Sequence, residues 1–287
     1  MLSIANVSAA QAENYYDADD YYTRDLDDAD TGTPSATWYG KGATALGLTS
    51  NFNQSTFQQL LHGEGPNGES LHARKIDPDH HRAATDCTFS APKSVSIAAL
   101  IQGDTRVLAA HDQAVRTALS VLETRYAQTR IRRPQGERER VTTGNVVTAI
   151  FRHETSREQD PQLHSHCVLI NATQLDHGQW RSLSNEAIVA HQKLLGEIYQ
   201  NELAYQLRQH GYDITPTTTG QFELTGYGAE LLNTFSTRTQ QIETYLEKWE
   251  QKLTENGGAP LHRSQQKQAT LDTRRRKTSV PRSVLLT

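Results

Sequence analysis

The chain has 287 residues, of which 36% are hydrophobic and 22% charged, and its formal net charge is −4. This composition is typical of a soluble globular protein. No apolar run approaches the roughly 18–20 residues that cross a bilayer, and the opening MLSIANVSAAQA lacks the basic start of a signal peptide. The two cysteines, Cys87 and Cys167, cannot build a disulfide framework or a C-x-x-C metal knuckle. The sequence therefore predicts a protein of a reducing cytoplasm.

The charges are segregated along the chain. Residues 1–31 have a net charge of −7 and residues 261–287 a net charge of +6. Between them, TRIRRPQGERERV at 129–141 carries five arginines against two glutamates. Such segregation is typical of a surface that follows DNA phosphates. The alternative is a solvated helix face followed by a disordered tail.

The first half of the chain predicts short strands and helices. LSIANV predicts a strand, and residues 8–23 predict a helix with Ser8 as its N-cap. GKGATALGLTSNFNQSTFQQLLHGEGPNG predicts loops around short helices. AATDCTFSAP predicts a strand that delivers Ser90 as the cap of a helix from Ala91 to about Ile101. Residues 104–126 predict a long helix, because apolar residues recur on one side of it: Val107, Leu108, Val115, Leu119 and Leu122.

The second half continues the mixture. VTTGNVVTAIFRH and LHSHCVLINA predict strands joined by a polar connection, and residues 185–211 predict a helix that ends before Gly211. YDITPTTTGQFELT predicts a hairpin, and the chain turns helical from Tyr227. Because strands and helices do not alternate strictly, we expect an α+β fold with a central antiparallel sheet of about five strands and flanking helices. Residues 1–225 would form this core, and residues 226–287 a helical, basic extension.

The most informative stretch is FRHETSREQDPQLHSHCVL, which holds His153, His164 and His166. Side chains two apart in a strand share a face, so His164 and His166 point the same way. His153 closes the preceding strand, and an antiparallel return brings it beside the pair. Three converging imidazoles suit a divalent transition metal. The alternative reading of H-x-H alone is two surface histidines that flank a buried strand.

Several metal chemistries lack their motifs in this sequence. There is no H-E-x-x-H of zinc proteases and no H-x-E with P-C-x-x-C of zinc deaminases, and no glutamate follows the H-x-H as in a cupin. Three neutral histidines leave the two charges of a divalent ion uncompensated. An anion is then the favoured further ligand, and phosphate is the obvious candidate.

Residues 13–23, ENYYDADDYYT, crowd four of the chain's eleven tyrosines among carboxylates. A free tyrosine, with a pKa of about 10, is a poor nucleophile at neutral pH, but a metal-polarised phosphate is a good electrophile for a phenol. On one helix Tyr15 and Tyr22 would be seven residues apart and nearly eclipsed. The alternative is an aromatic stripe that packs the helix onto the sheet. Together with a histidine metal site, the tyrosines favour nucleophilic chemistry.

Four segments together resemble the MobF family of conjugative relaxases, within the HUH endonucleases: NYYDADDYY, GKGATALGL, DCTFSAPKSVS and FRHETSREQDPQLHSH. The likeness runs in order from Met1 to about residue 225 and more loosely through the tail. It implies a metal-dependent transesterase that nicks one DNA strand at a plasmid's origin of transfer. Such an enzyme stays joined to the 5′ phosphate as a phosphotyrosine and later transfers or reseals the strand.

The resemblance also implies roles for individual residues. Tyr15 matches the main nucleophile, and Tyr21 or Tyr22 matches the tyrosine of a second transesterification. The family's metal ligands fall on the three histidines, with Mg²⁺ or Mn²⁺ as the expected ion and Zn²⁺ or another transition metal as the alternative. Asp86, before TFSAPKS, either orients a metal histidine or assists deprotonation of a tyrosine.

Four further residues are candidate DNA contacts. Lys93 starts a helix whose amides can meet a phosphate, although a capped helix with an exposed lysine is the alternative. Arg130 and Arg132 are spaced to lie on one face of a strand. Tyr16, beside the expected nucleophile, would pack or bind DNA.

The expected partners are single-stranded DNA of an origin of transfer and other relaxosome and conjugation coupling proteins, in a bacterial cytoplasm without membrane insertion. Family members usually continue into a helicase domain, and no G-x-x-x-x-G-K-[ST] occurs here. The extension is therefore expected to clasp DNA or to lead into such a domain. Two alternatives stay open: a replication-initiator or transposase-type nuclease of the same superfamily, and a non-catalytic single-stranded DNA-binding domain. The tyrosines preceding the histidines argue against the first.

Overall fold

The computed structural model describes residues 1–8, 36–48, 52–72, 82–134, 136–156, 158–218 and 220–255. At its centre lies a five-stranded sheet in the order β1-β3-β7-β6-β2, in which every neighbouring pair is antiparallel. The predicted α+β fold with an antiparallel sheet of about five strands is therefore confirmed. The strands of this sheet are β1 Leu2–Ser8, β2 Ala36–Tyr39, β3 Arg82–Ser90, β6 Thr148–Thr155 and β7 Pro161–Ile170.

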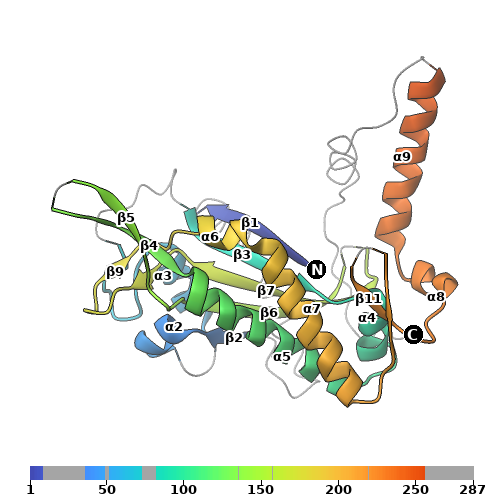
Figure 1. Ribbon diagram of the computed structural model, residues 1–287, viewed down its shortest axis with the longest axis horizontal. Helices are drawn as coiled ribbons and strands as arrows, with labels where there is room; N and C mark the ends of the chain where they lie inside the picture. The colour runs from blue at the N-terminus through green and yellow to red at the C-terminus, as the bar shows by residue number, and fades with distance from the viewer. Residues whose placement is uncertain are drawn as a thin grey trace.

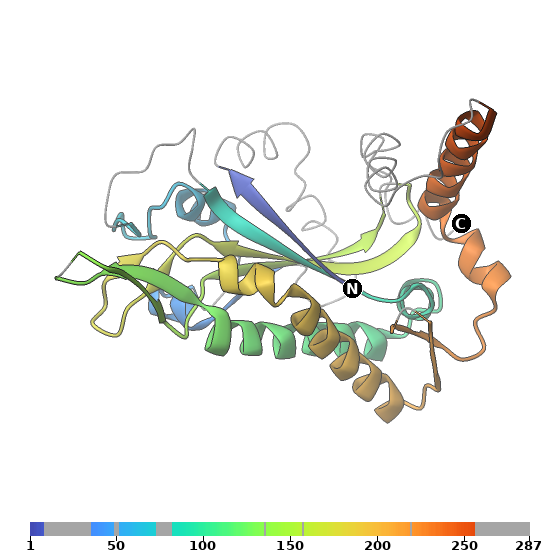
Figure 2. The same ribbon diagram turned by 45° about the horizontal axis from the view of Figure 1, so that its top comes forward.

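One face of the sheet, here the back face, is covered by helices α4 (Lys93–Leu100), α5 (Thr105–Val121) and α7 (Gln192–Gln209). Figures 1 and 2 show α5 and α7 running side by side across the sheet. Strand residues that alternate toward this side, such as Cys87 and Cys167, are fully buried in the same core as the apolar side of α5. The amphipathic pattern predicted for residues 104–126 thus packs as expected.

The opposite, front face carries a second core. There helices α2 (Lys41–Ala45) and α3 (Gln54–Leu61) join strand residues such as Phe151 and Val168. Helices therefore lie on both faces of the sheet. This front-face core involves one half of the sheet, and the histidine-bearing ends of β6 and β7 continue beyond it.

The GKG of the sequence has a steric reason in this structure. A Cβ atom on Gly40 would lie 2.2 Å from the carbonyl oxygen of Val146, and one on Gly42 would lie 2.8 Å from it. Gly40 also has a φ of 107°, which favours glycine. Next to them the buried carboxylate of Glu123 accepts hydrogen bonds from the backbone N–H groups of Lys41 and Val146. Glu123 belongs to a π-helical turn, η3 (Leu122–Tyr126), that follows α5.

Helix α4 begins later than predicted. Ser90 is not its cap, because β3 extends through Ser90 and the helix starts at Lys93 after an extended Pro92. Proline disfavours helical geometry in the residue before it, which excludes Ala91 from the helix. The first-turn N–H of Ser94 instead donates to Glu223, at 2.9 Å. A carboxylate 129 residues away thus replaces the expected local cap.

The helix predicted over residues 185–211 is interrupted. It divides into α6 (Glu186–Ala190) and α7, with His191 outside helical geometry between them. The ring of His191 stacks on Tyr126 of η3 at a centroid separation of 4.2 Å. Gly211 follows the end of α7 with a φ of 87°, as the sequence predicts.

Three two-stranded ribbons and two helices complete the described fold: β4 Gln128–Arg132 with β5 Arg138–Thr142, β8 Thr173–Gln174 with β9 Trp180–Arg181, β10 Ile214–Pro216 with β11 Phe222–Leu224, α8 Ala229–Thr234 and α9 Thr237–Glu255. Figure 1 shows the β4–β5 hairpin and α9 projecting from opposite ends of the molecule. In the described ranges, no helix combines the length and apolarity that crossing a membrane requires.

Candidate functional site

Three histidines meet on the front face of the sheet, where β6 and β7 run side by side. His153 of β6 lies in register with His164 of β7, and His166 follows two residues later on the same face. The ring centroids of His153 and His164 are 5.4 Å apart, and each lies 5.2 Å from the ring of His166. His153 and His166 are buried, with 2% and 5% of their surface exposed. The structure thus brings together the three side chains that the sequence pattern singled out.

The size of this triangle fits one metal ion. Its centre lies about 3 Å from each ring centroid, close to the separation set by an imidazole nitrogen bonded to a metal at about 2 Å. Within the described ranges, however, no group of three His, Cys, Asp or Glu side chains already has a complete metal-holding arrangement. The three rings nevertheless lie close enough together to surround one ion.

Hydrogen bonds at the Nδ1 atoms define the orientation of two of these rings. Nδ1 of His166 donates to the carboxylate of Asp86 at 2.7 Å, and Nδ1 of His164 donates to the backbone carbonyl of Gln162 at 2.8 Å. A proton on Nδ1 leaves the lone pair of each ring on Nε2, which is the nitrogen a metal would bind. An acceptor behind a histidine is the usual way of fixing a metal ligand.

Asp86 comes from β3, on the other side of β7. It is buried, and Thr88, two residues along the same face, donates to it at 3.4 Å and contacts Nδ1 of His166 at 3.1 Å. Of the two roles considered for Asp86, the contacts favour orientation of a metal histidine. Thr88 was not singled out from the sequence, although its place two residues after Asp86 in a strand was a usable signal.

A β-bulge follows immediately after His153. The pairing of β6 with β7 shifts between His153 and Thr155. Bulges re-aim side chains and often adjoin functional sites. Here the bulge ends the regular ladder next to the first histidine.

The four tyrosines of the expected nucleophile segment, Tyr15, Tyr16, Tyr21 and Tyr22, lie outside the described residues. The same holds for the basic segment 261–287.

The side chain of Lys93 is half-buried and is engaged within the protein. Its ammonium donates to the carbonyl of Pro161 at 3.0 Å, at the start of β7. Burial lowers the pKa of this lysine below its usual value. The side chain therefore ties α4 to the strand that carries the histidine pair.

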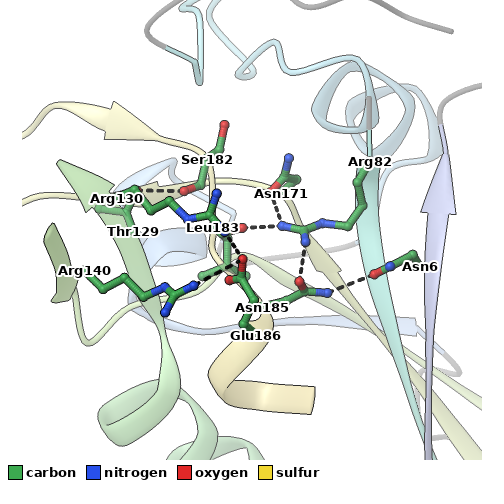
Figure 3. A network of polar contacts seen from close by, with 10 residues as sticks. All are labelled: Asn6, Arg82, Thr129, Arg130, Arg140, Asn171, Ser182, Leu183, Asn185 and Glu186. Carbon is green, nitrogen blue, oxygen red and sulfur yellow. Dashed lines mark hydrogen bonds and ion pairs between the residues drawn. The ribbon is translucent and has the colours of Figure 1, made fainter. Parts of the chain in front are cut away.

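The arginine-rich hairpin β4–β5 leaves the sheet at the end far from the histidines. Arg130 and Arg132 lie on one face of β4 and are exposed, as predicted. Figure 3 shows Arg130 and Arg140 converging on the carboxylate of Glu186 at the start of α6. The charge of Arg130 is thus matched by a carboxylate of the protein, whereas Arg132 lies further toward the tip.

Behind that hairpin a second polar network joins several segments around Arg82 (Figure 3). Its guanidinium donates to Asn171 at 2.6 Å, to Asn185 and to the carbonyl of Leu183. Asn185 in turn donates to Asn6 of β1 at 2.8 Å. This network was not predicted, because its members lie up to 179 residues apart along the chain.

The comparisons with known proteins agree with this geometry. Residues 9–286 match the TrwC relaxase family. The chain is 40% identical over 254 residues to the multifunctional conjugation protein TraI of Escherichia coli. That alignment covers 84% of this chain and 14% of TraI, so the chain spans about one seventh of that relative's length.

Solved structures agree over the whole chain. The conjugative relaxase TrwC in complex with oriT DNA, in a copper-bound structure, superposes with a TM-score of 0.84 at 39% identity, covering 100% of this chain and 95% of that one. TrwC complexed with a 27-mer DNA that comprises the recognition hairpin and the cleavage site gives a TM-score of 0.83 at 37% identity, with the same coverage. The predicted family is thereby confirmed, and the chain belongs to the TrwC relaxases, as a MobF-type N-terminal relaxase domain.

Proposed function

We propose that this chain nicks one strand of DNA at an origin of transfer by transesterification and later transfers or reseals that strand. The observation that carries the proposal is the triangle of His153, His164 and His166, with Asp86 behind His166, in a chain of this family. The bound DNA of the TrwC structures supports single-stranded origin DNA as the substrate. Other proteins of conjugation are its expected partners, since TraI is a conjugation protein.

The three histidines would hold a divalent metal, which supplies a Lewis acid for the phosphate to be attacked. The donor set fits, because two rings have Nδ1 engaged with an acceptor and so offer Nε2. Imidazole donors suit transition metals better than Mg²⁺, and a TrwC structure contains copper. We therefore rank Mn²⁺, Zn²⁺ and related ions above Mg²⁺. The protein's part is to hold the rings in place and to keep the site compact through Asp86 and Thr88.

Tyr15 is the proposed nucleophile. Its phenol oxygen forms a bond to phosphorus, the bond from phosphorus to the 3′ oxygen breaks, and that oxygen leaves with a proton as a 3′ hydroxyl. The phosphotyrosine conserves the bond for religation. Tyr21 or Tyr22 would perform a second transfer, since a tyrosine already esterified to DNA cannot attack again.

Arg132 is the stronger of the two proposed arginine contacts to DNA, because Arg130 is paired with Glu186. Lys93 is the weaker candidate among the cations, since it donates to Pro161. Tyr16 stays a proposed packing or DNA contact. The division into a core at 1–225 and an extension at 226–287 is likewise a proposal, supported by the projection of α9 in Figure 1. Thr237, at the start of α9, donates to the buried Asp160 of the core at 2.8 Å.

A bacterial cytoplasmic location is also proposed. Cys87 and Cys167 face each other in register on β3 and β7, and both are buried free thiols. Burial raises the pKa of both thiols, which keeps them protonated and unreactive. These features suit a reducing compartment.

The experiment that tests the function begins with a random single-stranded DNA library incubated with the chain and Mn²⁺. Sequencing of the DNA that stays attached to protein in a denaturing gel gives the cleaved sequence. An oligonucleotide of that sequence should then form a covalent adduct with the wild type and none with Tyr15→Phe. Tyr205→Phe, which alters a tyrosine that is 56% exposed on α7, is the matched control and should form the adduct normally.

The same oligonucleotide separates the alternatives. Mass spectrometry should find the DNA on Tyr15 after the first cleavage. Tyr21→Phe and Tyr22→Phe should keep that cleavage, and one of them should impair a second transfer. Binding without any adduct would instead identify a non-catalytic single-stranded DNA-binding domain.

A further inference from the structure

A group of polar side chains, all buried except the partly exposed Asp112, lies directly behind the histidine triangle, on the back face of the sheet. We call it the polar seam: His111, Asp112, Arg152, Ser165 and Tyr199. We propose that the polar seam positions the histidine-bearing ends of β6 and β7, and thereby sets how tightly the triangle holds a metal. The inference rests on the proposed function, because it assigns these residues to the same site.

The position of the polar seam follows from strand geometry. Ser165 is the residue between His164 and His166, so its side chain points to the opposite face of β7. Its partner in register across β6 is Arg152, the residue before His153. The two seam residues of the sheet are thus chain neighbours of all three histidines.

The helices supply partners for both strands at once. His111 and Asp112 are consecutive residues of α5. Nε2 of His111 meets the hydroxyl of Ser165 at 2.8 Å, and the carboxylate of Asp112 accepts from Arg152 at 2.8 Å. Within one turn of α5, His111 is therefore hydrogen-bonded to β7 and Asp112 to β6.

Tyr199 extends the polar seam to α7. Its hydroxyl meets Nδ1 of His111 at 2.8 Å, so both ring nitrogens of His111 have partners. His111, Ser165 and Tyr199 are fully buried, and Arg152 is 6% exposed. Burial and the nearby Arg152 lower the pKa of His111 to about 3, and burial raises that of Tyr199. At neutral pH both are uncharged, so one ring nitrogen of His111 donates and the other accepts in this chain of hydrogen bonds.

Further hydrogen bonds also hold β7 against the helices of the back face. Ser96 of α4 accepts from the backbone N–H of Leu163 at 3.0 Å, and Lys93 donates to the carbonyl of Pro161 at 3.0 Å. Residues 161, 163 and 165 are therefore each bonded to a side chain of a helix on the back face. His164 and His166 alternate with them on the front face.

A simple core would not need this arrangement. Apolar side chains at positions 111, 152 and 165 would stabilise packing without fixing one register, because apolar contact is not directional. A slip of β7 by one residue would turn both histidines of the pair to the back face. The slip would also separate Ser165 from His111 and leave Nε2 of that fully buried ring without its partner, which is disfavoured. The polar seam thus ties the register of β7 to the placement of the histidines.

The test compares metal affinity with folding. Ser165→Ala removes one hydroxyl, and Ser165→Thr restores it on the same strand position. Ser94→Ala is the matched control, because Ser94 is equally buried and hydrogen-bonded, at 2.7 Å to the N–H of Leu224, without contact to the polar seam. Each variant is titrated with Mn²⁺ by electron paramagnetic resonance and with Co²⁺ by its visible absorption. Circular dichroism and oligonucleotide affinity are measured in parallel.

We expect Ser165→Ala to bind Mn²⁺ about tenfold more weakly and to change the Co²⁺ spectrum, with fold and oligonucleotide affinity kept. Excess Mn²⁺ should restore its nicking, and Ser165→Thr should recover the affinity. Ser94→Ala should lower the melting temperature and leave the affinity and the spectrum as in the wild type. His111→Phe, which breaks two contacts at once, should weaken Mn²⁺ binding further; if it does not fold, Ser165→Ala decides the matter.

Two failures are distinguishable. Wild-type Mn²⁺ affinity that His164→Ala leaves unchanged would overturn the proposed metal function itself. If His164→Ala weakens Mn²⁺ binding but Ser165→Ala keeps the wild-type Mn²⁺ affinity and Co²⁺ spectrum, only the role of the polar seam is overturned. An equal loss of Mn²⁺ affinity in Ser94→Ala would also overturn the role of the polar seam, because the effect would then come from general stability.

Discussion

The two ends of the central sheet are built differently. At one end, His153, His164 and His166 come from two neighbouring strands within one short stretch of chain, and their places follow from the alternation of a strand. At the other end, beneath the β4–β5 hairpin, Arg82 bonds Asn171 and the stretch Leu183–Asn185, and Asn185 extends the network to β1. The first end gathers three imidazole rings around one point. The second holds an arginine-rich arm in place.

This contrast predicts that chemistry and DNA attachment can be damaged separately. The largest effect belongs to the histidine end. His164→Ala should reduce the rate of nicking by about a thousandfold, because it removes one of three expected ligands of the Lewis acid. Affinity for the oligonucleotide should stay within a few fold, since phosphate contacts by lysine and arginine supply most of it.

Gel-based nicking at saturating DNA and fluorescence anisotropy measure the two quantities. His177→Ala, in the exposed turn between β8 and β9, is the control and should change neither. An equal loss of nicking and binding in His164→Ala would remove the distinction between the two ends.

The second effect belongs to the Arg82 end. Arg82→Met should lower the free energy of unfolding by about 2–4 kcal/mol, because it leaves the buried amides of Asn171 and Asn185 without their partner. Hydrogen exchange should rise in the β4–β5 hairpin, while the rate of nicking at saturating DNA and Mn²⁺ should be kept. Arg125→Met, at an exposed position of η3, is the control. A nicking rate that falls as far as in His164→Ala would show that the two ends are coupled.

The same contrast explains what the sequence could reveal. The histidine triangle was predictable because H-x-H in a strand and an antiparallel return place three rings by local rules. The start of α4 was only partly predictable: Pro92 excludes Ala91 by a local rule, but the N–H of Ser94 is bonded by Glu223 of a distant hairpin. The Arg82 network and the polar seam were hidden for the same reason. His111 and Ser165 are 54 residues apart, and nothing in either local pattern points to the other.

The interruption at His191 gives a related lesson. Residues 185–211 read as one helix because their pattern is helical throughout. At the break, the ring of His191 stacks on Tyr126, a contact with a different element that no local pattern shows. Local periodicity predicted the elements well, and contacts between distant segments decided where they begin, end and bend.

The third prediction concerns acid. His111, behind the histidine end, has a pKa of about 3 in the fold, against 6.5 when unperturbed. Its contribution to stability is therefore complete above about pH 6.5 and is lost as pH falls, by about 1.4 kcal/mol per unit down to about pH 3, because only the unfolded chain takes up the proton. Urea unfolding at several pH values should show this slope in the wild type and a shallower one in His111→Gln. His177→Gln should keep the wild-type slope; an unchanged slope in His111→Gln would refute the assignment.

The smallest effect distinguishes two arginines of the hairpin. Arg132→Ala should weaken oligonucleotide binding only a few fold and reduce the slope of log affinity against log salt by about 1, because one phosphate contact and its released counterion are lost. Arg130→Ala should change the slope less, since Arg130 already pairs with Glu186 and its charge is matched within the protein. Glu186→Gln sharpens the comparison: it frees Arg130 and the more distant Arg140 for phosphate, and it should steepen the slope more in the wild type than in Arg130→Ala. Anisotropy titrations over a series of salt concentrations measure the wild type, the three single variants and the double variant. Equal slopes in Arg130→Ala and Arg132→Ala would mean that the ion pair with Glu186 does not withhold Arg130 from DNA.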